Sequence, residues 1–315
     1  MNTSSASSQP VRGLRAAVSP LALAIGLIAS VLGSQVQAAS VYVSSEKDNK
    51  IVVFDAEGKQ TSTIDVCKRP RHLMFSPDKS QIYVCCGDSN QLGIVDRASG
   101  KMTDTVPLGD SPELFDISPD GKVVYVSIED DSVLAAYDLA TKKQLFSVKT
   151  GGEPEGVLLS RDGKLAYVTS EEANVVHVID LATRKIVKNI KTGNRPRRFA
   201  LSADGSELWV TNELSGSVSV VDTAKHTVKA TVDFKIKGMR KSDITPVGVV
   251  MTKDGKTAWV TLGKANHVAE VDVATREVRR TVLAGRRAWG LTLSTDDHTQ
   301  LVPTGRTDDM TLVSP

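Results

Sequence analysis

The apolar positions of residues 39–315 fall in short runs of four to six, rich in valine, isoleucine and threonine, with polar turns between them. β-Branched runs of this length, bounded by turn residues, are typical of strands and not of helices. Ala203-Asp204-Gly205 predicts a tight hairpin turn, since glycine tolerates positive φ. Around that turn the pattern predicts four strands, over 197–201, 207–211, 218–221 and 227–232.

This four-strand unit is repeated along the chain. Turn aspartates recur 42, 42, 42, 50 and 42 residues apart, at Asp78, Asp120, Asp162, Asp204, Asp254 and Asp296. Five residues after most of them stands an aromatic residue: Tyr83, Tyr125, Tyr167, Trp209 and Trp259. A proline opens most units, at Pro70, Pro112, Pro154, Pro196 and Pro246, with Ala288 in the sixth place. The period identifies the aspartates as turn formers and the aromatics as packing residues, not as catalytic acids or a cofactor site.

Four antiparallel strands in a unit of about 42 residues are typical of a β-propeller blade. Second-strand motifs at Tyr42, at the five aromatics above and, weakly, at Leu301-Val302 predict seven blades. The motifs begin at a second strand and end near a third. We therefore expect an all-β, seven-bladed propeller, incomplete at its C-terminus and open at the seam. The alternative is a six-bladed ring closed by residues 289–293, with 294–315 as a tail.

Residues 1–38 precede the repeats and have the pattern of a secretory signal peptide. Arg12 and Arg15 form its positive region, and the apolar segment 21–32 is too short to cross a bilayer. Val36-Gln37-Ala38 predicts cleavage after Ala38, and a transmembrane anchor is the alternative for this segment. We expect one propeller domain over residues 39–315, exported to the periplasm as a monomer without a membrane span after cleavage.

Charge and composition exclude several classes of function. With 40% hydrophobic residues the chain can bury a full core, which excludes disorder. The net charge is +2 and both surplus arginines lie in the signal peptide, so the neutral body argues against nucleic-acid binding. No phosphate loop, nucleophile elbow or Cys-x-x-Cys-His haem motif is present. The five histidines lack ligand spacing, and no metal site is predicted.

The three cysteines are Cys67, Cys85 and Cys86. In an oxidising periplasm one disulfide can form, from Cys67 to Cys86 or to Cys85, leaving one free thiol. Adjacent cysteines rarely bond to each other, because a disulfide prefers a larger Cα separation. The alternative is that the cysteines are small buried residues of a strand.

The repeats resemble a known family. Tyr167-Val168-Thr169-Ser170, Trp209-Val210-Thr211-Asn212 and Val178-Ile179-Asp180-Leu181-Ala182-Thr183 are similar to the YVTN family of bacterial β-propeller repeats. Arg69-Pro70-Arg71 and Asn194-Arg195-Pro196-Arg197-Arg198 resemble the subgroup associated with PQQ-dependent catabolism. The resemblance implies an accessory protein of quinone-dependent alcohol oxidation, with a periplasmic quinoprotein dehydrogenase or cytochrome as its partner. PQQ enters only through this resemblance, and no bound cofactor is predicted.

Candidate binding residues surround the unit prolines. In a propeller, the loops that enter the inner strands and those that join strands two and three emerge on one face, around the channel mouth. The candidates are Arg69, Arg71, His72, Glu113, Glu155, Arg195, Arg197, Arg198, Arg286, Arg287 and Trp289. Clustered arginines attract and grip carboxylates, so we expect an anionic ligand or an acidic partner protein. The eight extra residues within 234–245 should project over the same face.

Three alternatives remain open. The arginines can be solvated and paired with nearby acids: Asp110, Glu113, Glu153, Glu155 and Asp243. The protein can be a lactonase-like hydrolase with Glu113, Glu155, Arg197 and His72 at the channel mouth. It can also be an envelope interaction module of unrelated role. The fold hosts all of these functions, and we expect binding without catalysis.

Overall fold

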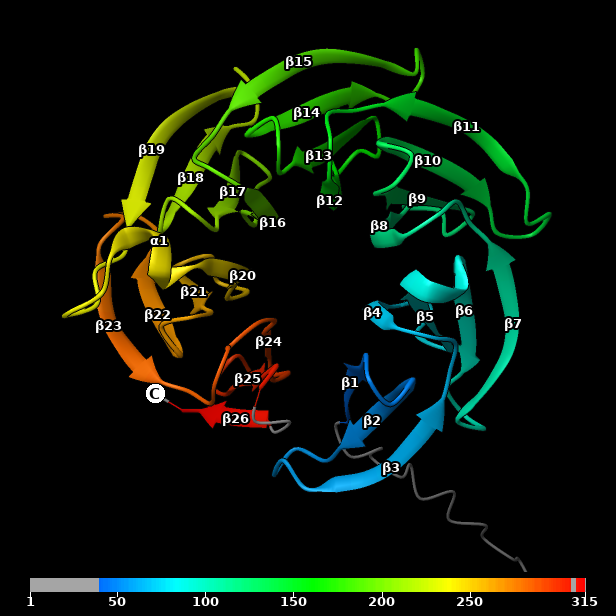
Figure 1. Cartoon of the computed structure of the whole chain (residues 1–315), viewed down its shortest axis with the longest axis horizontal. Coiled ribbons are helices and arrows are strands. Elements are labelled where there is room, and N and C mark those ends of the chain that lie inside the picture. The colour runs from blue at the N-terminus through cyan, green and yellow to red at the C-terminus, as the bar shows by residue number, and fades with distance from the viewer. Residues whose placement is uncertain (1–39, 307–309, 315) are drawn as a thin grey trace, which may run out of the picture. The chain divides into compact units, whose positions relative to one another are not determined.

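The computed structural model describes residues 40–306 and 310–314, and the signal peptide predicted for residues 1–38 lies outside them. The described residues form seven β-sheets arranged in a ring (Figure 1). Five sheets have four antiparallel strands and two have three. The predicted all-β, seven-bladed propeller is confirmed. The six-bladed alternative is wrong, because β24 (Thr292–Leu293), β25 (Gln300–Pro303) and β26 (Met310–Val313) form a sheet of their own.

Successive sheets form blades 1 to 7, and each four-stranded blade runs from its inner strand to its outer one. Blade 1 contains β1 (Val41–Ser45), β2 (Lys50–Phe54) and β3 (Gln60–Asp65). Blade 2 contains β4 (Pro70–Phe75), β5 (Gln81–Cys86), β6 (Gln91–Asp96) and β7 (Lys101–Pro107), with the 3-10 turn η1 (Gly87–Ser89) after β5. Blade 3 contains β8 (Pro112–Ile117), β9 (Val123–Ile128), β10 (Val133–Asp138) and β11 (Gln144–Lys149).

Blade 4 contains β12 (Pro154–Leu159), β13 (Leu165–Ser170), β14 (Val175–Asp180) and β15 (Lys185–Lys191). Blade 5 contains β16 (Pro196–Leu201), β17 (Glu207–Asn212), β18 (Ser217–Asp222) and β19 (Thr227–Asp233). The helix α1 (Lys241–Ile244) precedes blade 6, which contains β20 (Pro246–Met251), β21 (Thr257–Leu262), β22 (His267–Asp272) and β23 (Val278–Leu283). Strands β24 to β26 form blade 7.

The hydrophobic pattern located the strands of blade 5 to within one residue at each end. The repeated aspartates act as turn formers, as predicted. Asp204, for example, accepts hydrogen bonds from the Ser202 hydroxyl at 2.6 Å and from the Ser206 N–H at 3.0 Å. Gly205 beside it has φ +74°, the conformation that favours glycine in this turn.

The inserted segment before blade 6 is anchored at both ends by buried apolar side chains. Phe234 and Ile244 are at most 1% exposed and pack in the core shared by blades 5 and 6. The backbone of Lys241 lies so close to Gly216 that a Cβ there would come within 2.5 Å of its carbonyl oxygen. The insertion therefore lies against the loop that joins β17 to β18, which is a loop of the channel-mouth face.

A bulge near the start of each complete inner strand frees two residues from the ladder. In blade 4, Pro154 pairs with Ser170, but pairing resumes only at Val157 with Val168. Blades 2, 3, 5 and 6 shift register at the same place. The two freed residues of each blade need other hydrogen-bond partners, because a buried unpaired backbone group is costly.

Hydroxyl groups of the second strands supply these partners and also join neighbouring blades. Thr169 accepts a hydrogen bond from the Gly156 N–H at 2.7 Å and donates one to the Arg197 carbonyl of the next blade at 3.0 Å. We call these contacts the interblade hydroxyl bridges. They run from Ser44 to Arg71, Ser127 to Glu155, Thr169 to Arg197, Thr211 to Val247 and Thr261 to Trp289.

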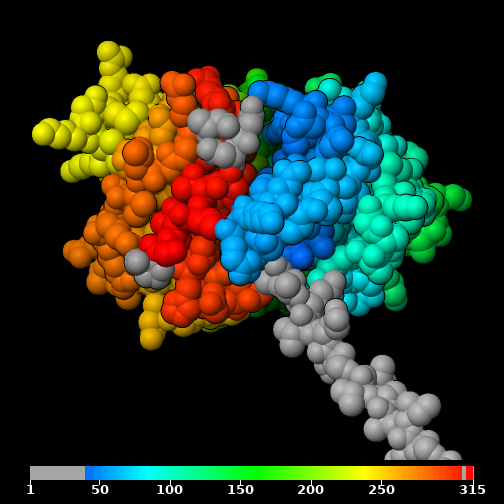
Figure 2. Space-filling view, turned by 90° about the horizontal axis from the view of Figure 1, so that it is seen from below, coloured from blue at the N-terminus to red at the C-terminus, as the bar shows by residue number. Residues whose placement is uncertain are grey.

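Two positions of this pattern lack a hydroxyl. Cys85 occupies it in blade 2 and is fully buried, whereas Pro303 occupies it in blade 7, at the seam. Blades 1 and 7 lie side by side at the seam (Figures 1 and 2), with Leu312 against Gly58. Among the described residues no strand of one blade pairs with a strand of the other, so no strand ladder closes the ring there.

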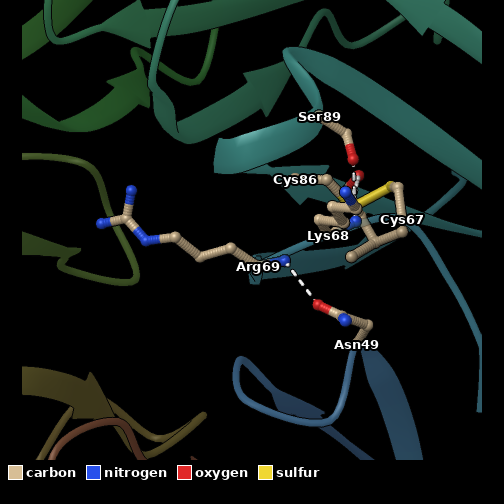
Figure 3. The surroundings of a disulfide bond; sticks show 7 residues. Asn49, Cys67, Lys68, Arg69, Cys86 and Ser89 are labelled. Carbon is tan, nitrogen blue, oxygen red and sulfur yellow. Dashed lines mark hydrogen bonds between the residues drawn. A yellow bond between two sulfur atoms is a disulfide. The ribbon is translucent and has the colours of Figure 1, made fainter.

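A disulfide joins Cys67, in the loop between blades 1 and 2, to Cys86 at the end of β5 (Figure 3). The Cα atoms are 5.7 Å apart, a usual separation for a disulfide, and Cys85 is the free thiol. The equivalent pair in blade 5 is Gly193 and Asn212, where the Gly193 N–H donates to the Asn212 side chain at 3.1 Å. Blade 2 thus replaces a hydrogen bond with a covalent bond, which ties the three-stranded blade 1 to the ring.

Removal of this disulfide is expected to destabilise the protein. Reduction or Cys67→Ser/Cys86→Ser should lower the free energy of unfolding by about 2–4 kcal/mol, measured by urea denaturation. The matched variant Cys67→Gly/Cys86→Asn reproduces the blade 5 pair and should recover part of the loss. Equal stability of the oxidised and reduced proteins would contradict this role.

The hydroxyl bridges give a second prediction. Thr169→Val leaves the Gly156 N–H and the Arg197 carbonyl without their partner and should cost about 1–3 kcal/mol, whereas Thr169→Ser should be close to wild type. Cys85→Ser provides the hydroxyl that blade 2 lacks and should not destabilise the protein. Thermal unfolding of the three variants tests this, and wild-type stability of Thr169→Val would refute the bridge.

Candidate functional site

The residue before each unit proline is held in the left-handed conformation at the channel mouth. Arg69, Ser111, Glu153, Arg195, Thr245 and Arg287 all have φ between +48° and +61°. Two hydrogen bonds hold the backbone of such a residue in this conformation. The Arg195 N–H donates to the Asn174 side chain at 2.7 Å, and its carbonyl accepts from the Glu213 N–H at 2.9 Å. The repeat therefore pins the backbone from which the candidate side chains project.

A belt of alternating arginine and glutamate side chains lines the mouth along blades 2 to 5. At its centre the Glu155 side chain, only 6% exposed, lies 3.6 Å from Arg71 and 3.1 Å from Arg197. Arg71 also contacts Glu113 at 2.5 Å, and Glu113 lies 3.5 Å from Arg69. The arginines and glutamates named from the sequence are thus brought together, but they contact one another and are largely withdrawn from solvent.

The belt continues beyond Arg197. Glu171 forms ion pairs with Arg197 and with Arg195, the latter at 2.6 Å. Glu213 lies 3.1 Å from Arg195 and 3.6 Å from Arg197. We call the ionic belt the eight residues Arg69, Arg71, Glu113, Glu155, Glu171, Arg195, Arg197 and Glu213.

Two belt carboxyl groups differ in protonation at neutral pH, because their surroundings shift their pKa values in opposite directions. Burial alone would raise the pKa of Glu155, but Arg197, Arg71 and Arg198 outweigh it and hold that pKa at about 2. Burial and the neighbouring Glu155 raise the pKa of Glu113 to about 9. Glu155 therefore carries the negative charge of this pair at neutral pH, and Glu113 holds the proton.

The sequence suggested that nearby acids would pair with solvated arginines, and this is correct only for some of them. Glu113 and Glu155 pair with arginines, but the arginines are largely buried. Glu153 lies 3.6 Å from Arg195. Asp110 instead accepts a hydrogen bond from Asn90 at 2.5 Å.

Glu171 and Glu213 were missed by sequence reasoning. Each directly follows the second strand of its blade, and Glu129 occupies the same place in blade 3, at the 42-residue period. The loop that carries them was expected on the channel-mouth face. A search for charged residues recurring after the second strand would therefore have found them.

Below the belt, one residue further along the inner strands, lies a chamber of about 260 Å³. Its walls are mostly apolar, and its polar lining residues are His72, Asp116 and Arg198. The His72 ring packs edge-on against Phe115 at 5.0 Å. Burial and the positive charge of Arg198 lower the pKa of His72 to about 3, so this histidine is neutral at physiological pH.

Arg198 is the cation of this chamber. Its Nε is buried without a hydrogen-bond partner among the described residues, and burial lowers its pKa while Glu155 only partly offsets the effect. Its guanidinium reaches across to blade 7, where a Cβ on Gly290 would lie 3.5 Å from Nη1. Arg198 is half-buried, and a guanidinium withdrawn from water without a bound carboxylate is costly, which points to an anionic ligand.

At blade 7 an aromatic residue, Trp289, occupies the position at which blades 2 to 5 carry arginine or glutamate. The Trp289 ring lies between two guanidinium groups, 5.1 Å from that of Arg197 and 4.4 Å from that of Arg287. Arg286 and Arg287 are exposed. None of the ion pairs between described residues includes Arg198, Arg286 or Arg287. The uncompensated positive charge therefore lies on the side of blades 5 to 7.

A larger groove of about 680 Å³ lies elsewhere, between β19, the loop at 192–194 and α1. It contains none of the residues selected from the sequence, and its Lys241 is paired with Asp233 at 2.7 Å. Across residues 40–306 and 310–314, no group of His, Cys, Asp and Glu side chains could hold a metal ion. The same residues include no helix with the length and apolarity needed to cross a membrane.

Figure 3 shows how the disulfide positions one end of the belt. Cys67 is followed by Lys68, whose N–H donates to the Ser89 hydroxyl at 2.8 Å, and by Arg69, whose N–H donates to the Asn49 side chain at 3.0 Å. The Arg69 side chain extends away from the sulfur atoms toward Glu113.

Solved structures of low sequence identity share this fold. Hydrazine synthase of Kuenenia stuttgartiensis matches with a TM-score of 0.78 at 20% identity, over 88% of this chain and 92% of that one. A functionally unknown protein of Desulfotomaculum acetoxidans matches with a TM-score of 0.74 at 15% identity, over 87% and 91% of the two chains. At these identities the likeness shows the fold alone.

No curated protein sequence matches the chain significantly. The sequence model of YNCE-like β-propellers, however, matches residues 102–301, nearly two thirds of the chain. This segment contains blades 3 to 6 completely, with most of the ionic belt and Arg198. The chain belongs to the YNCE-like β-propeller family.

Proposed function

We propose that the protein is an exported, non-catalytic propeller that binds an anionic ligand at its channel mouth. The observation that carries this proposal is Arg198, a half-buried cation with a buried Nε that faces a chamber and lacks a carboxylate partner among the described residues. On the blade 7 side Arg287 stacks on Trp289, and a Cβ on the following Gly290 would lie 3.5 Å from Arg198 Nη1. An incoming anion would supply the missing partner.

A small ligand fits this site better than an acidic partner protein. The belt arginines are already paired with carboxylates, and the Arg71 and Arg197 side chains are only 11% and 7% exposed. A protein surface could reach the exposed Arg286 and Arg287 and the partly exposed Arg69 and Arg195, which are already paired, but not Arg71 or Arg197. The capacity to bind an anion therefore lies in the chamber.

The link to PQQ-dependent alcohol catabolism is the finer part of the proposal. It is supported by the resemblance of Arg69-Pro70-Arg71 and of residues 194–198 to that subgroup. A periplasmic quinoprotein dehydrogenase or its cytochrome would then be the partner. Mixing the purified proteins at low and high salt tests this link, and it fails if no salt-sensitive association is seen.

The geometry favours binding over hydrolysis. A hydrolase would need an acid or base free to exchange protons at the mouth. The Glu155 carboxylate is held by two arginines, and His72 has its pKa lowered to about 3. Glu113 keeps a proton, but its side chain is only 2% exposed and lies 2.5 Å from Arg71. Lactone hydrolysis by the purified protein that disappears in Glu155→Gln would overturn the non-catalytic assignment.

Anion binding itself is the first prediction of this section. Titration calorimetry at low salt with phosphate, citrate, acetate and benzoate should show one-to-one binding of at least one of these anions. Its affinity should fall as sodium chloride is added, because the interaction is between charges. Failure of all four to bind would refute the proposal.

The charge of the mouth depends on Glu113. This carboxyl group is faced by Glu155, Arg71, Glu129 and Arg69, and it keeps its proton at neutral pH because its pKa is raised to about 9. When Glu113 loses this proton, a negative charge is added beside the chamber. The folded protein also holds a proton there that the unfolded chain releases near pH 4.5, the ordinary value for glutamate.

Stability is therefore expected to fall as the pH rises from about 4.5 to about 9, whereas anion affinity is expected to fall only near the folded-state pKa, where Glu113 loses its proton. Because the folded-state pKa is the higher one, the loss occurs between the two values and not below them. The matched variant Glu113→Gln stays neutral and should make both profiles less steep, while Glu171, whose pKa burial raises to about 8, titrates in both proteins. The measurements are calorimetry and thermal unfolding across this pH range, and identical profiles for the two proteins would contradict the assignment.

A further inference from the structure

We infer that the chamber binds a small monocarboxylate with an aromatic or aliphatic tail, with its carboxylate on Arg198. This inference rests on the proposed function and names the class of ligand for the same site. It follows from the number of charges in the chamber, the nature of its walls and its volume.

The charged residues of the chamber can balance one negative charge on a ligand. Arg198 is the cation among the residues that line the chamber, since His72 is neutral at physiological pH. Asp116 is already engaged, because its carboxylate accepts hydrogen bonds from the Leu159 and Ile117 N–H groups, both at 2.8 Å. A second negative charge on the ligand would meet Asp116 or Glu155 without a cation to balance it.

The walls favour an apolar tail. Around the Arg198 head group the lining residues are Met74, Leu114, Phe115, Val157, Leu158, Phe199, Val249 and Leu291. Apolar walls with few polar anchors are typical of sites that bury the body of a ligand and orient it by one group. Phosphate or sulfate would fill only the end of the chamber at Arg198 and would leave the apolar part unused.

The volume limits the size of that tail. About 260 Å³ corresponds to the space of roughly nine water molecules at about 30 Å³ each. Benzoate and hexanoate, with about this number of non-hydrogen atoms, would fit, whereas a disaccharide or a nucleotide would not.

Three glycines lie where the inner strands approach the next blade or the Arg198 guanidinium. A Cβ on Gly156 would come within 2.3 Å of the Arg197 carbonyl oxygen, and one on Gly248 within 2.8 Å of the Trp289 carbonyl oxygen. Glycine is therefore required where the inner strands of blades 4 and 6 approach the next blade. Gly290 differs, because a Cβ there would meet only Arg198 Nη1 at 3.5 Å and Pro303 at 3.8 Å. A side chain at position 290 can thus block the space in front of the guanidinium without a backbone clash.

The test is calorimetric titration of the full-length mature protein with benzoate, hexanoate, acetate, phosphate and benzyl alcohol. Benzoate or hexanoate should bind one-to-one and at least about tenfold more tightly than acetate, because only they fill the apolar part. Arg198→Gln should weaken this binding by about tenfold or more. Arg184→Gln, the matched loss of an exposed arginine in the turn between β14 and β15, should change it by less than about twofold.

If Arg198→Gln does not fold, Gly290→Leu provides the second variant, since it should block binding while the arginine remains. Arg198-dependent binding of phosphate without binding of benzoate or hexanoate would overturn the ligand class but leave the proposed function standing. Failure of every anion would overturn both. Carboxylate binding unaffected by Arg198→Gln and Gly290→Leu, or equal affinity for benzyl alcohol and benzoate, would overturn the chamber as the site.

Discussion

The interblade hydroxyl bridge is the interaction on which the rest of the molecule depends. The bulge after each unit proline leaves backbone groups without ladder partners, and one serine or threonine of the second strand satisfies them. The same hydroxyl donates to the residue that follows the proline of the next blade. One side chain therefore hydrogen-bonds the unpaired backbone of the bulge, joins two blades and fixes the backbone of a channel-mouth residue. Arg71, Glu155, Arg197 and Trp289 are all held in this way.

The departures from this rule lie at the start and end of the ring. Blade 2 has a thiol in place of the hydroxyl, and the Cys67–Cys86 disulfide lies immediately beside it. That disulfide ties the first, three-stranded blade to its neighbour. Blade 7 has Pro303 at the equivalent position, and proline has no hydroxyl to donate. The described part of the seam has no strand ladder and no hydroxyl at position 303, and Leu312 packs against Gly58 there.

Sequence periodicity predicted the backbone but not the side-chain partners. The 42-residue spacing placed the strands of blade 5 and the prolines of the channel mouth, because strand and turn signals are local. The cysteine positions also limited the possible disulfide to two pairs, Cys67 with Cys86 or Cys67 with Cys85. The partners of Arg195 and Arg197 could not be predicted, since they depend on how far long side chains reach between adjacent blades. Glu171 and Glu213 emerge from a different loop than the prolines, and only ring closure brings them to the arginines.

The same competition for carboxylates explains why one arginine remains unpaired. Glu155 is the acid whose charge most stabilises the Arg198 cation, but Arg71 and Arg197 already hold its two oxygens at 3.6 and 3.1 Å. Glu171 and Glu213 are bound to Arg195 and Arg197, and Glu113 keeps a proton. The belt therefore does more than neutralise its own arginines. By holding Glu155, Glu171 and Glu213 it limits internal pairing of Arg198, while backbone N–H groups hold Asp116, so that a carboxylate from outside the protein meets a cation already in position.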